Sequence, residues 1–351
     1  MIKTSMPGKG LNIKFRSNKY LKWLLYTGLL FIFLIISILL SLSIGEINLS
    51  LVDIREILNT QAQNIEYAIL TKIRLPRTFL GLAVGGGLSL AGVILQGIYR
   101  NPLVEPYTLG ISGGAALGVA LSIVFNLQHL MGSFILPLTG FAGAGITIIL
   151  VYSLSLKNGK INIQNMLLIG VMISFIVSSA MMFLMAISTT EDLHGIIFWT
   201  MGSLDEPNKW LIRITLGASL GGLAAAYLLV QPLNALRIGE VKAKHLGINT
   251  ESAVRFLFVI ASLLTGICVA VAGVIGFVGL IVPHLMRLLV GSDFRVLLIN
   301  AFIGGGAFLI LSDLLARTII APNELPIGVI TGIIGGTIFI VVLSKANLKM
   351  K

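Results

Sequence analysis

One stretch of this 351-residue chain limits the folds that are open to it. It begins with two arginines around Leu75-Pro76 and continues with an apolar run, residues 78–98, that contains no charged side chain. The run breaks at 100–102 (RNP), and a second apolar run starts after Pro106. Because an α-helix rises 1.5 Å per residue and a bilayer core is about 30 Å thick, roughly 20 residues cross it. The stretch therefore predicts a membrane-spanning hairpin with arginines at one end and a polar turn at the other.

The composition of the whole chain indicates an integral membrane protein. Hydrophobic residues make up 56% of it and charged residues 11%, whereas a soluble domain has about 25% charged residues. The net charge of +11 is spread over short segments between apolar runs, so nucleic acid is not an expected partner. The single cysteine, Cys268, is expected to be a small buried hydrophobe.

Ten apolar runs are long enough to predict transmembrane helices, so the expected fold class is an all-α integral membrane protein. They are residues 21–44, 78–98, 108–125, 134–154, 166–187, 211–230, 253–272, 274–290, 296–315 and 327–343. The first run is longer than the core of a signal peptide and lacks a small-residue cleavage site, so it is expected to be retained. The run 274–290 is the least regular, because it is short and contains Pro283 and His284.

The distribution of lysine and arginine predicts an orientation. An even number of spans places both termini on one side, and a cytoplasmic location for them leaves 18 of the 25 basic residues in cytoplasmic segments. This excess agrees with the positive-inside rule, so both termini are predicted to be cytoplasmic. The basic residues on the outside are then Arg55, Lys72, Arg74, Arg77, Lys209, Arg213 and Arg317.

A short internal repeat suggests two related halves. LSLAGVILQG (88–97) and VAVAGVIGFVG (269–279) share AGVI. In the ten-span order the first copy descends to the cytoplasm and the second rises from it, which is the arrangement of inverted repeats in transporters. Four matching small and apolar residues also arise by chance in a chain with 39 glycines.

The sequence shows no catalytic constellation, metal-ligand spacing or cofactor motif. A GxxxxGK[ST] loop is absent, so the chain is not expected to bind nucleotide itself. An ion-coupled carrier would place ionisable residues near mid-membrane, but the predicted spans are nearly free of them, and Asp313 and Arg317 lie near an outer end. These observations disfavour a membrane enzyme and a secondary carrier, and they predict transport that another subunit drives.

Arg74, Arg77 and Arg317 lie on the outer side, against the general distribution of basic residues. One interpretation is that they are interfacial anchors, a role that lysine fills as well. The other is that they bind an acidic partner, because a guanidinium group pairs with a carboxylate through two parallel hydrogen bonds. The residues alone leave both interpretations open.

The longest polar segment on the inner side is 231–252, in which apolar and charged residues alternate. Gly239 and Gly247 lie where short helices would end. A solvated connector would explain this pattern, and so would a helix–glycine–helix element that docks into a groove of a partner protein. On the outer side, 198–206 (FWTMGSLDE) predicts a short interfacial helix with Trp199 in the aromatic belt.

Several of these segments resemble a single family. The pattern RLPR, a Gly- and Ala-rich span, and then QGxxxNPLxxPxxLGxxxGA is similar to the permeases of bacterial ABC importers for iron-siderophores, haem and cobalamin. Further similar segments are FWTMGSLD, the glycine-containing pattern of residues 238–247, GFVGLIVPHLMRLLVGSDFR (276–295) and residues 312–343. The resemblance extends over almost the whole chain from Leu21 onward.

The resemblance implies a transporter permease subunit, not an enzyme, in the bacterial cytoplasmic membrane. The permease would pair with an identical or related permease, bind two cytoplasmic ATP-binding subunits and receive its cargo from an extracellular substrate-binding protein or lipoprotein. The chain then divides into a basic cytoplasmic segment (1–20), a ten-span permease domain (21–344) with a coupling loop (231–252), and a cytoplasmic tail (345–351). No cofactor is implied. The expected cargo is a ferric siderophore, with haem and cobalamin as alternatives.

Individual residues take roles from the same resemblance. Arg74, Arg77 and Arg317 match arginines that form salt bridges to glutamates of the binding protein. Ile163 and Gln164 match a cytoplasmic gate that carries hydroxyl groups in one branch of the family, whereas this chain has none there. The path would be lined by the second, fifth and tenth spans and by 198–204, with Trp199 and Gly202 at its outer end. The residues that would couple to the ATP-binding subunit are Leu236, Gly239, Glu240, Ala243, Leu246 and Gly247.

Overall fold

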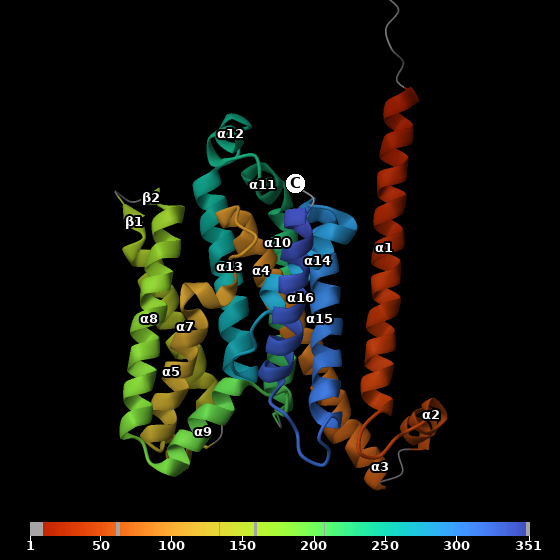
Figure 1. Ribbon diagram of the computed structural model, residues 1–351, viewed down its shortest axis with the longest axis vertical. Helices are drawn as coiled ribbons and strands as arrows, with labels where there is room; N and C mark the ends of the chain where they lie inside the picture. Colours follow the sequence, from red (N-terminus) through yellow and green to blue (C-terminus); the bar gives the residue numbers. More distant parts are fainter. Residues whose placement is uncertain (1–9, 61–63, 133, 158–159, 207, 349–351) are drawn as a thin grey trace, which may run out of the picture.

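A computed structural model describes residues 10–60, 64–132, 134–157, 160–206 and 208–348 of the chain. Helices account for nearly all of these residues, and the long helices stand side by side along the long axis of the molecule (Figure 1). The strands in this part of the chain are the two-residue segments β1 (Leu156–Lys157) and β2 (Lys160–Ile161), which pair antiparallel. The predicted helical fold class is confirmed.

Seven helices in the described residues are long and apolar enough to cross a membrane, and three shorter apolar helices accompany them. Each predicted span overlaps one of these helices, but the number that crosses a bilayer, ten, stays a prediction. The seven are α1 (Gly10–Ser43), α4 (Leu75–Tyr99), α7 (Ile135–Leu154), α8 (Ile163–Ile187), α10 (Lys209–Leu228), α13 (Thr250–Ala272) and α15 (Phe294–Thr318). The three are α5 (Ile111–Val124), α14 (Val278–Val290) and α16 (Ile327–Leu348).

The remaining helices are short and lie at the two ends of the bundle or at its turns. They are α2 (Leu51–Thr60), α3 (Ile65–Ala68), η1 (Ile69–Arg74), η2 (Pro106–Leu109), α6 (Leu127–Met131), α9 (Thr190–Met201), α11 (Val230–Leu236) and α12 (Glu240–His245). Figure 1 places α12 at the same end as the start of α1 and the end of α16, whereas α2, α3 and α9 lie at the opposite end. We call the α12 end the inner end and the α9 end the outer end.

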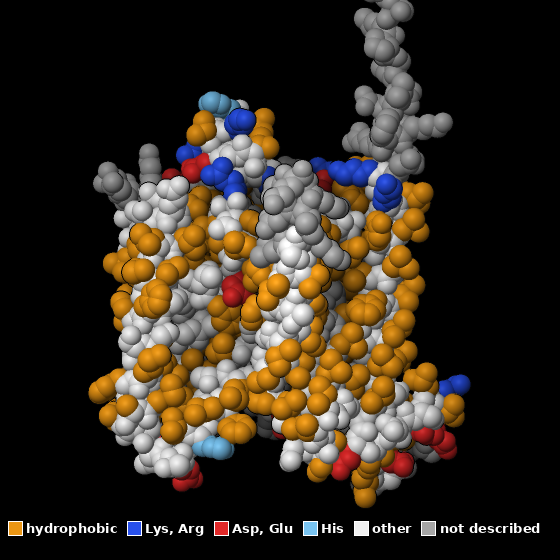
Figure 2. All heavy atoms as spheres, in the orientation of Figure 1, with side chains coloured by type: hydrophobic (Ala, Val, Ile, Leu, Met, Phe, Trp, Pro, Cys, Tyr) orange, Lys and Arg blue, Asp and Glu red, His pale blue; other side chains and the backbone are white. Residues whose placement is uncertain are grey.

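Both described ends of the chain therefore lie at the inner end, as an even number of spans requires. Residues 1–9 of the predicted N-terminal segment and 349–351 of the predicted tail lie outside the described residues. The visible face is hydrophobic over most of its middle, lysines and arginines gather near α12, and acidic residues are prominent at the outer end (Figure 2). This distribution is that of a protein with an apolar belt inside a bilayer.

Helix α4 is the centre of the bundle, and all but a few of its 25 residues are buried. It packs against α10, α13, α14 and α15. It approaches α15 closely, since a side chain on Gly85 would overlap the carbonyl oxygen of Gly305 and one on Gly305 would overlap that of Gly85. Without side chains at these positions the two backbones touch, which is how small residues drive helix packing in lipid.

Two of the shorter helices follow non-helical segments of the chain. Residues 100–105 connect α4 to η2 and α5, and residues 273–277 connect α13 to α14, where Gly273 and Phe277 have φ of 72° and 69°. The two segments meet, since the Phe277 N–H donates to the Glu105 carboxylate, and the Tyr107 hydroxyl of η2 donates to the Ile275 carbonyl oxygen. Such backbone is tolerated at membrane depth only where protein satisfies its polar groups.

The two copies of the short repeat differ in local structure. The first copy, 88–97, lies entirely within α4, whereas the second, 269–279, covers the end of α13, the connection and the start of α14. The inverted relation of the two halves therefore stays a prediction. The expected helix at 198–206 is wrong in its second half, because α9 ends at Met201 and Gly202 adopts φ 78°.

Candidate functional site

Two of the three arginines with a predicted docking role, Arg77 and Arg317, share one buried carboxylate. Asp313 on α15, with a side chain 3% exposed, accepts a hydrogen bond from Arg77 Nε at 2.9 Å and forms an ion pair with Arg317 Nε at 3.1 Å. Arg77 also donates from Nη1 and Nη2 to the two carboxylate oxygens of Glu324, at 3.0 and 2.7 Å. The Arg77 and Arg317 side chains are 7% and 8% exposed, but Glu324 is 46% exposed. Glu324 is thus the surface end of an otherwise buried network.

Arg74 and Arg317 bind the outer end of α1. Arg317 Nη2 donates to the carbonyl oxygen and the hydroxyl of Ser41, each at 3.1 Å. Arg74 Nη1 donates to the Leu42 carbonyl oxygen at 2.6 Å, and its Nη2 donates to that of Ile47. These carbonyls lie in or just beyond the last turn of a helix, where a cation is favourable. The arginines therefore join α1, α4 and α15, and their predicted docking role stays a prediction.

Other basic residues of the outer end are exposed. They are Arg55, Lys72, Lys209 and Arg213. Arg213 lies 5.8 Å from the centre of the Trp210 ring. Arg74, Arg77 and Arg317 therefore differ from the other basic residues of the outer end in being buried. The sequence pattern did not indicate this difference.

Trp199 and Gly202 lie together at an outer cavity. They line a space of about 420 Å³ with Arg77, Glu324 and Leu204. The segment after Gly202 is fixed to the end of α13, because the Ser203 N–H donates to the Ala272 carbonyl oxygen at 2.9 Å. The arginine network and the predicted outer end of the path therefore open into one cavity.

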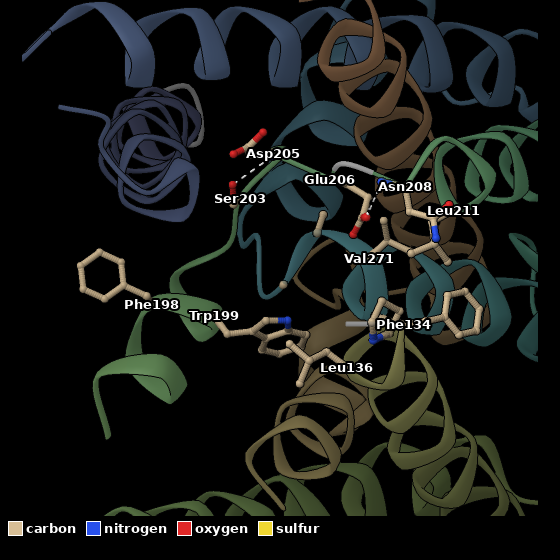
Figure 3. A pocket seen from close by; sticks show the side chains of 14 residues that line it. Phe134, Leu136, Phe198, Trp199, Ser203, Asp205, Glu206, Asn208, Leu211 and Val271 are labelled. Carbon is tan, nitrogen blue, oxygen red and sulfur yellow. Dashed lines mark hydrogen bonds between the residues drawn. The ribbon is translucent and has the colours of Figure 1, made fainter. Parts of the chain in front are cut away.

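A second pocket, of about 200 Å³, is also lined by Trp199. In Figure 3 the Trp199 ring faces Leu136 and the pocket, and Glu206 and Asn208 approach from the segment that leads into α10. The Asn208 N–H donates to Glu206 Oε1 at 2.8 Å. Burial raises the pKa of the Glu206 carboxyl, and this hydrogen bond partly opposes the rise.

Ile163 and Gln164 lie at the inner end, at the start of α8. They line a cavity of about 680 Å³ with Tyr99, Asn101 and Glu240. Since α8 has 25 residues, its two ends are about 37 Å apart, so these residues are far from Trp199 and Gly202. The structure thus brings the predicted gate residues together with Glu240 of the coupling loop.

The predicted coupling loop has a helix–glycine–helix structure. Gly239, with φ 107°, separates α11 from α12, and Gly247, with φ 81°, follows α12. Leu236 and Ala243 are buried in the chain, whereas Leu246 is 65% exposed. Glu240 forms an ion pair with Lys244 at 2.8 Å, and this hydrogen bond raises the pKa of Lys244. Leu246, which directly follows α12, therefore exposes most of its apolar surface.

Asn234 connects α11 to the first turn of α15. Its Nδ2 donates to Asp293 Oδ1 and its Oδ1 accepts from the Phe294 N–H, both at 3.2 Å. Asp293 also accepts from the Arg295 N–H at 3.1 Å and pairs with Lys19 at 3.5 Å. Partial burial opposes ionisation, but these hydrogen bonds and charges outweigh it, so the pKa of Asp293 is below its ordinary value.

Glu105 is an ionisable residue inside the bundle that the sequence pattern did not indicate. It follows the RNP turn, which the sequence predicts to be polar, and η2 directly after it packs on α4, α5, α8 and α13. A backbone hydrogen bond from Phe277 reaches its carboxylate, and its Oε2 is buried with no hydrogen-bond partner among the described residues. A glutamate between Pro102 and Pro106 was the available signal, because two prolines favour a non-helical connection.

Comparison with known proteins identifies the class. The model of the FecCD transport family matches residues 33–345. The hemin transport system permease of Yersinia pestis is 38% identical, over 90% of this chain and 94% of its own length. The vitamin B12 import permease of Klebsiella pneumoniae is 36% identical, over 93% and 94%. The molybdate import permease of Haemophilus influenzae is also 36% identical, over 89% and 93%.

A solved structure agrees with the sequence relatives. An inward-facing conformation of a metal-chelate type ABC transporter superposes with a TM-score of 0.82 at 33% identity, over 91% of this chain and 99% of that one. The fold and the relatives define a multi-pass permease subunit of an ABC importer, not an enzyme. The chain belongs to the FecCD transport family, as the sequence resemblance predicted. Permeases of this class form dimers and work with ATP-binding subunits and a substrate-binding protein.

Proposed function

We propose that this chain transports a ferric siderophore across the bacterial cytoplasmic membrane, as one of two permease subunits above two ATP-binding subunits. The observation that carries the choice of a bulky cargo is the outer cavity of about 420 Å³, where Phe198, Trp199 and Leu204 present apolar surface and the charges of Arg77 and Glu324 lie together. Such a lining suits a large chelate with an apolar exterior better than a small oxyanion. Haem is the second candidate, because the relative from Yersinia pestis is a hemin permease.

The proposed orientation has ten spans, two inverted halves and the inner end in the cytoplasm. It is supported by the basic residues near α12 and by the location of both described chain ends. The exposed apolar residues of the coupling loop, Ile238, Val241 and Leu246, then face the ATP-binding subunit. An apolar helix face laid into a groove is a common way for a helix to bind a partner.

The binding protein docks at the outer end through the arginine network. Arg77 is the residue that exchanges its partner, because Glu324 is exposed and a carboxylate of the binding protein can take its place. Asp313 and Arg317 stay buried and hold the Arg77 guanidinium in position. The bidentate pair of Arg77 with Glu324 is thus replaced by a pair of Arg77 with a carboxylate of the binding protein, in the same geometry.

Movement passes between the two ends through α4 and α15. Asn234 fastens α11 to the start of α15, and Leu233 and Phe294 pack on Gly97 of α4. The same two helices touch at Gly85 and end near the shared carboxylate at the outer end. Because packed helices move as rigid bodies, displacement of α11 by the ATP-binding subunit shifts both helices and alters the outer cavity.

The test is uptake of radiolabelled ferric siderophores, haem and cobalamin by a strain that lacks this gene and by the same strain with the gene restored. We expect loss confined to ferric siderophores, rescue by the gene, and dependence on ATP. Loss confined to haem would establish the second candidate. Unchanged uptake of all three would contradict the cargo assignment and leave the family membership intact.

A further inference from the structure

Three arginines surround a small cavity at the inner end. The cavity has a volume of about 230 Å³, and its arginines come from three separate segments: Arg100 after α4, Arg237 after α11 and Arg287 in the last turn of α14. Ser292 adds a hydroxyl to the lining, and none of the lining residues is acidic. Arg100 and Arg237 are exposed and Arg287 is partly buried, so three positively charged side chains border one space.

No ion pair with a carboxylate joins these arginines among the described residues, whereas three other basic residues of the inner end have one. Lys19 pairs with Asp293, Lys244 pairs with Glu240, and an ion pair of 3.5 Å joins Arg255 to Glu251. Arg287 is half-buried and lies close enough to Arg237 to feel its charge. Like charges in a partly desolvated space repel each other, and guanidinium groups do not lose their protons. A bound anion would remove this repulsion.

The backbone around the cavity is also unusual. Arg100 adopts φ 51° and ψ 33°, a left-handed conformation that is uncommon for a residue with a side chain. This conformation brings Arg100 to Gly239, where an added Cβ would lie 3.4 Å from Arg100 Nη1. Backbone strain of this kind persists where the surroundings impose it, often at ligand sites. Arg100 therefore connects the cavity to the glycine between α11 and α12.

We propose that the three arginines form a binding site for a phosphate group, supplied by the headgroup of an anionic lipid or by inorganic phosphate. A phosphate offers more acceptor oxygens than a carboxylate, so it can meet three converging guanidinium groups at once. The cavity lies where α4 and α14 end, at the level at which helices leave a bilayer, and basic pockets there bind lipid headgroups. The lipid source rests on the proposed orientation, because anionic lipids are enriched in the cytoplasmic leaflet.

The experiment measures binding to the full-length protein in zwitterionic detergent. Native mass spectrometry would follow retention of dioleoylphosphatidylglycerol against dioleoylphosphatidylcholine, and isothermal titration calorimetry would follow inorganic phosphate. The variant is R237Q/R287Q. The matched control, R255Q/R295Q, removes the same charge from exposed arginines at the same end.

We expect the R237Q/R287Q variant to bind the phosphate probe about tenfold more weakly or worse, because two charge-assisted contacts are lost, with the control unchanged. Selective loss of phosphatidylglycerol assigns the lipid, and selective loss of inorganic phosphate assigns the free ion. Equal binding by wild type and both variants would overturn the proposal. So would a variant that binds both probes normally but no longer assembles with the ATP-binding subunits, since the arginines would then meet protein carboxylates. The assay contains no cargo, so failure here is distinguishable from failure of the transport assignment.

Discussion

The Asp313→Asn substitution tests whether the outer arginines form a structural network. Asp313 places its two oxygens 2.9 and 3.1 Å from the guanidinium groups of Arg77 and Arg317, and all three side chains are almost fully buried. Removing one member of a buried ion pair costs about 3–5 kcal/mol. Arg77 would keep Glu324, whereas Arg317 would keep only the neutral oxygens of Ser41. We therefore expect a loss near the lower limit, about 3 kcal/mol.

The assay is thermal unfolding of the purified permease in detergent, followed by tryptophan fluorescence and by size-exclusion chromatography. The matched variant is Glu324→Gln, which neutralises the other carboxylate bound to the same Arg77. Because Glu324 is 46% exposed, its ion pair is worth at most about 1 kcal/mol. Each variant loses one negative charge, so the difference in stability between them measures how much more a buried carboxylate contributes than an exposed one.

Equal, small decreases in the unfolding temperature of the two variants would refute the reasoning, because Asp313 would then not be stabilising two buried cations. A large loss in Asp313→Asn with native behaviour in Glu324→Gln would support it. Because Glu324→Gln is expected to fold normally, it also allows docking to be tested without a change in folding. If the binding protein exchanges places with Glu324, it should bind Glu324→Gln more tightly than wild type, measured by surface plasmon resonance on the immobilised importer.

Three further predictions follow from the helix contacts. Gly305→Leu should disrupt the contact of α4 with α15 and lower stability by about 3 kcal/mol or more, whereas Gly145→Leu, at an open position, should be tolerated in the same thermal assay. Asn234→Ala should leave the importer assembled but reduce the stimulation of its ATPase activity by loaded binding protein; unaltered stimulation would contradict a role for α11 in coupling. Because the pKa of Asp293 is lowered on folding, its stabilising contribution is present above about pH 4 and disappears as pH falls through the lower folded value. The stability difference between wild type and Asp293→Asn should therefore be constant near neutral pH and shrink in acid.

The helices of this fold could be predicted from the sequence because lipid makes the pattern simple. Backbone groups must be satisfied within each segment, so every apolar run of sufficient length becomes a helix. The coupling loop followed equally local rules, with Gly239 and Gly247 at positive φ where the helices stop. Local signals fail where the chain leaves the helix inside the bundle, as at Glu105, because a polar turn in sequence is indistinguishable from one that packs among helices.

The burial of the outer arginines could not be predicted for a different reason. Arg77 meets Asp313 and Glu324 across 236 and 247 residues of sequence, and no pattern around Arg77 indicates those partners. The positive-inside rule predicts that Arg77 lies on the outer side but says nothing about whether a side chain there is exposed. Tertiary packing decided that question.

This burial also changes how docking must work if the arginines have the proposed role. A free guanidinium at the surface would gain a new ion pair on docking, but Arg77 already has a bidentate partner in Glu324. Exchanging one exposed carboxylate for another is nearly neutral in electrostatic free energy, since the desolvation and the hydrogen bonds of the two states are similar. The exchange therefore supplies orientation and specificity rather than strong affinity. Under the proposed function, this balance would allow the binding protein to leave the permease after it has delivered its cargo.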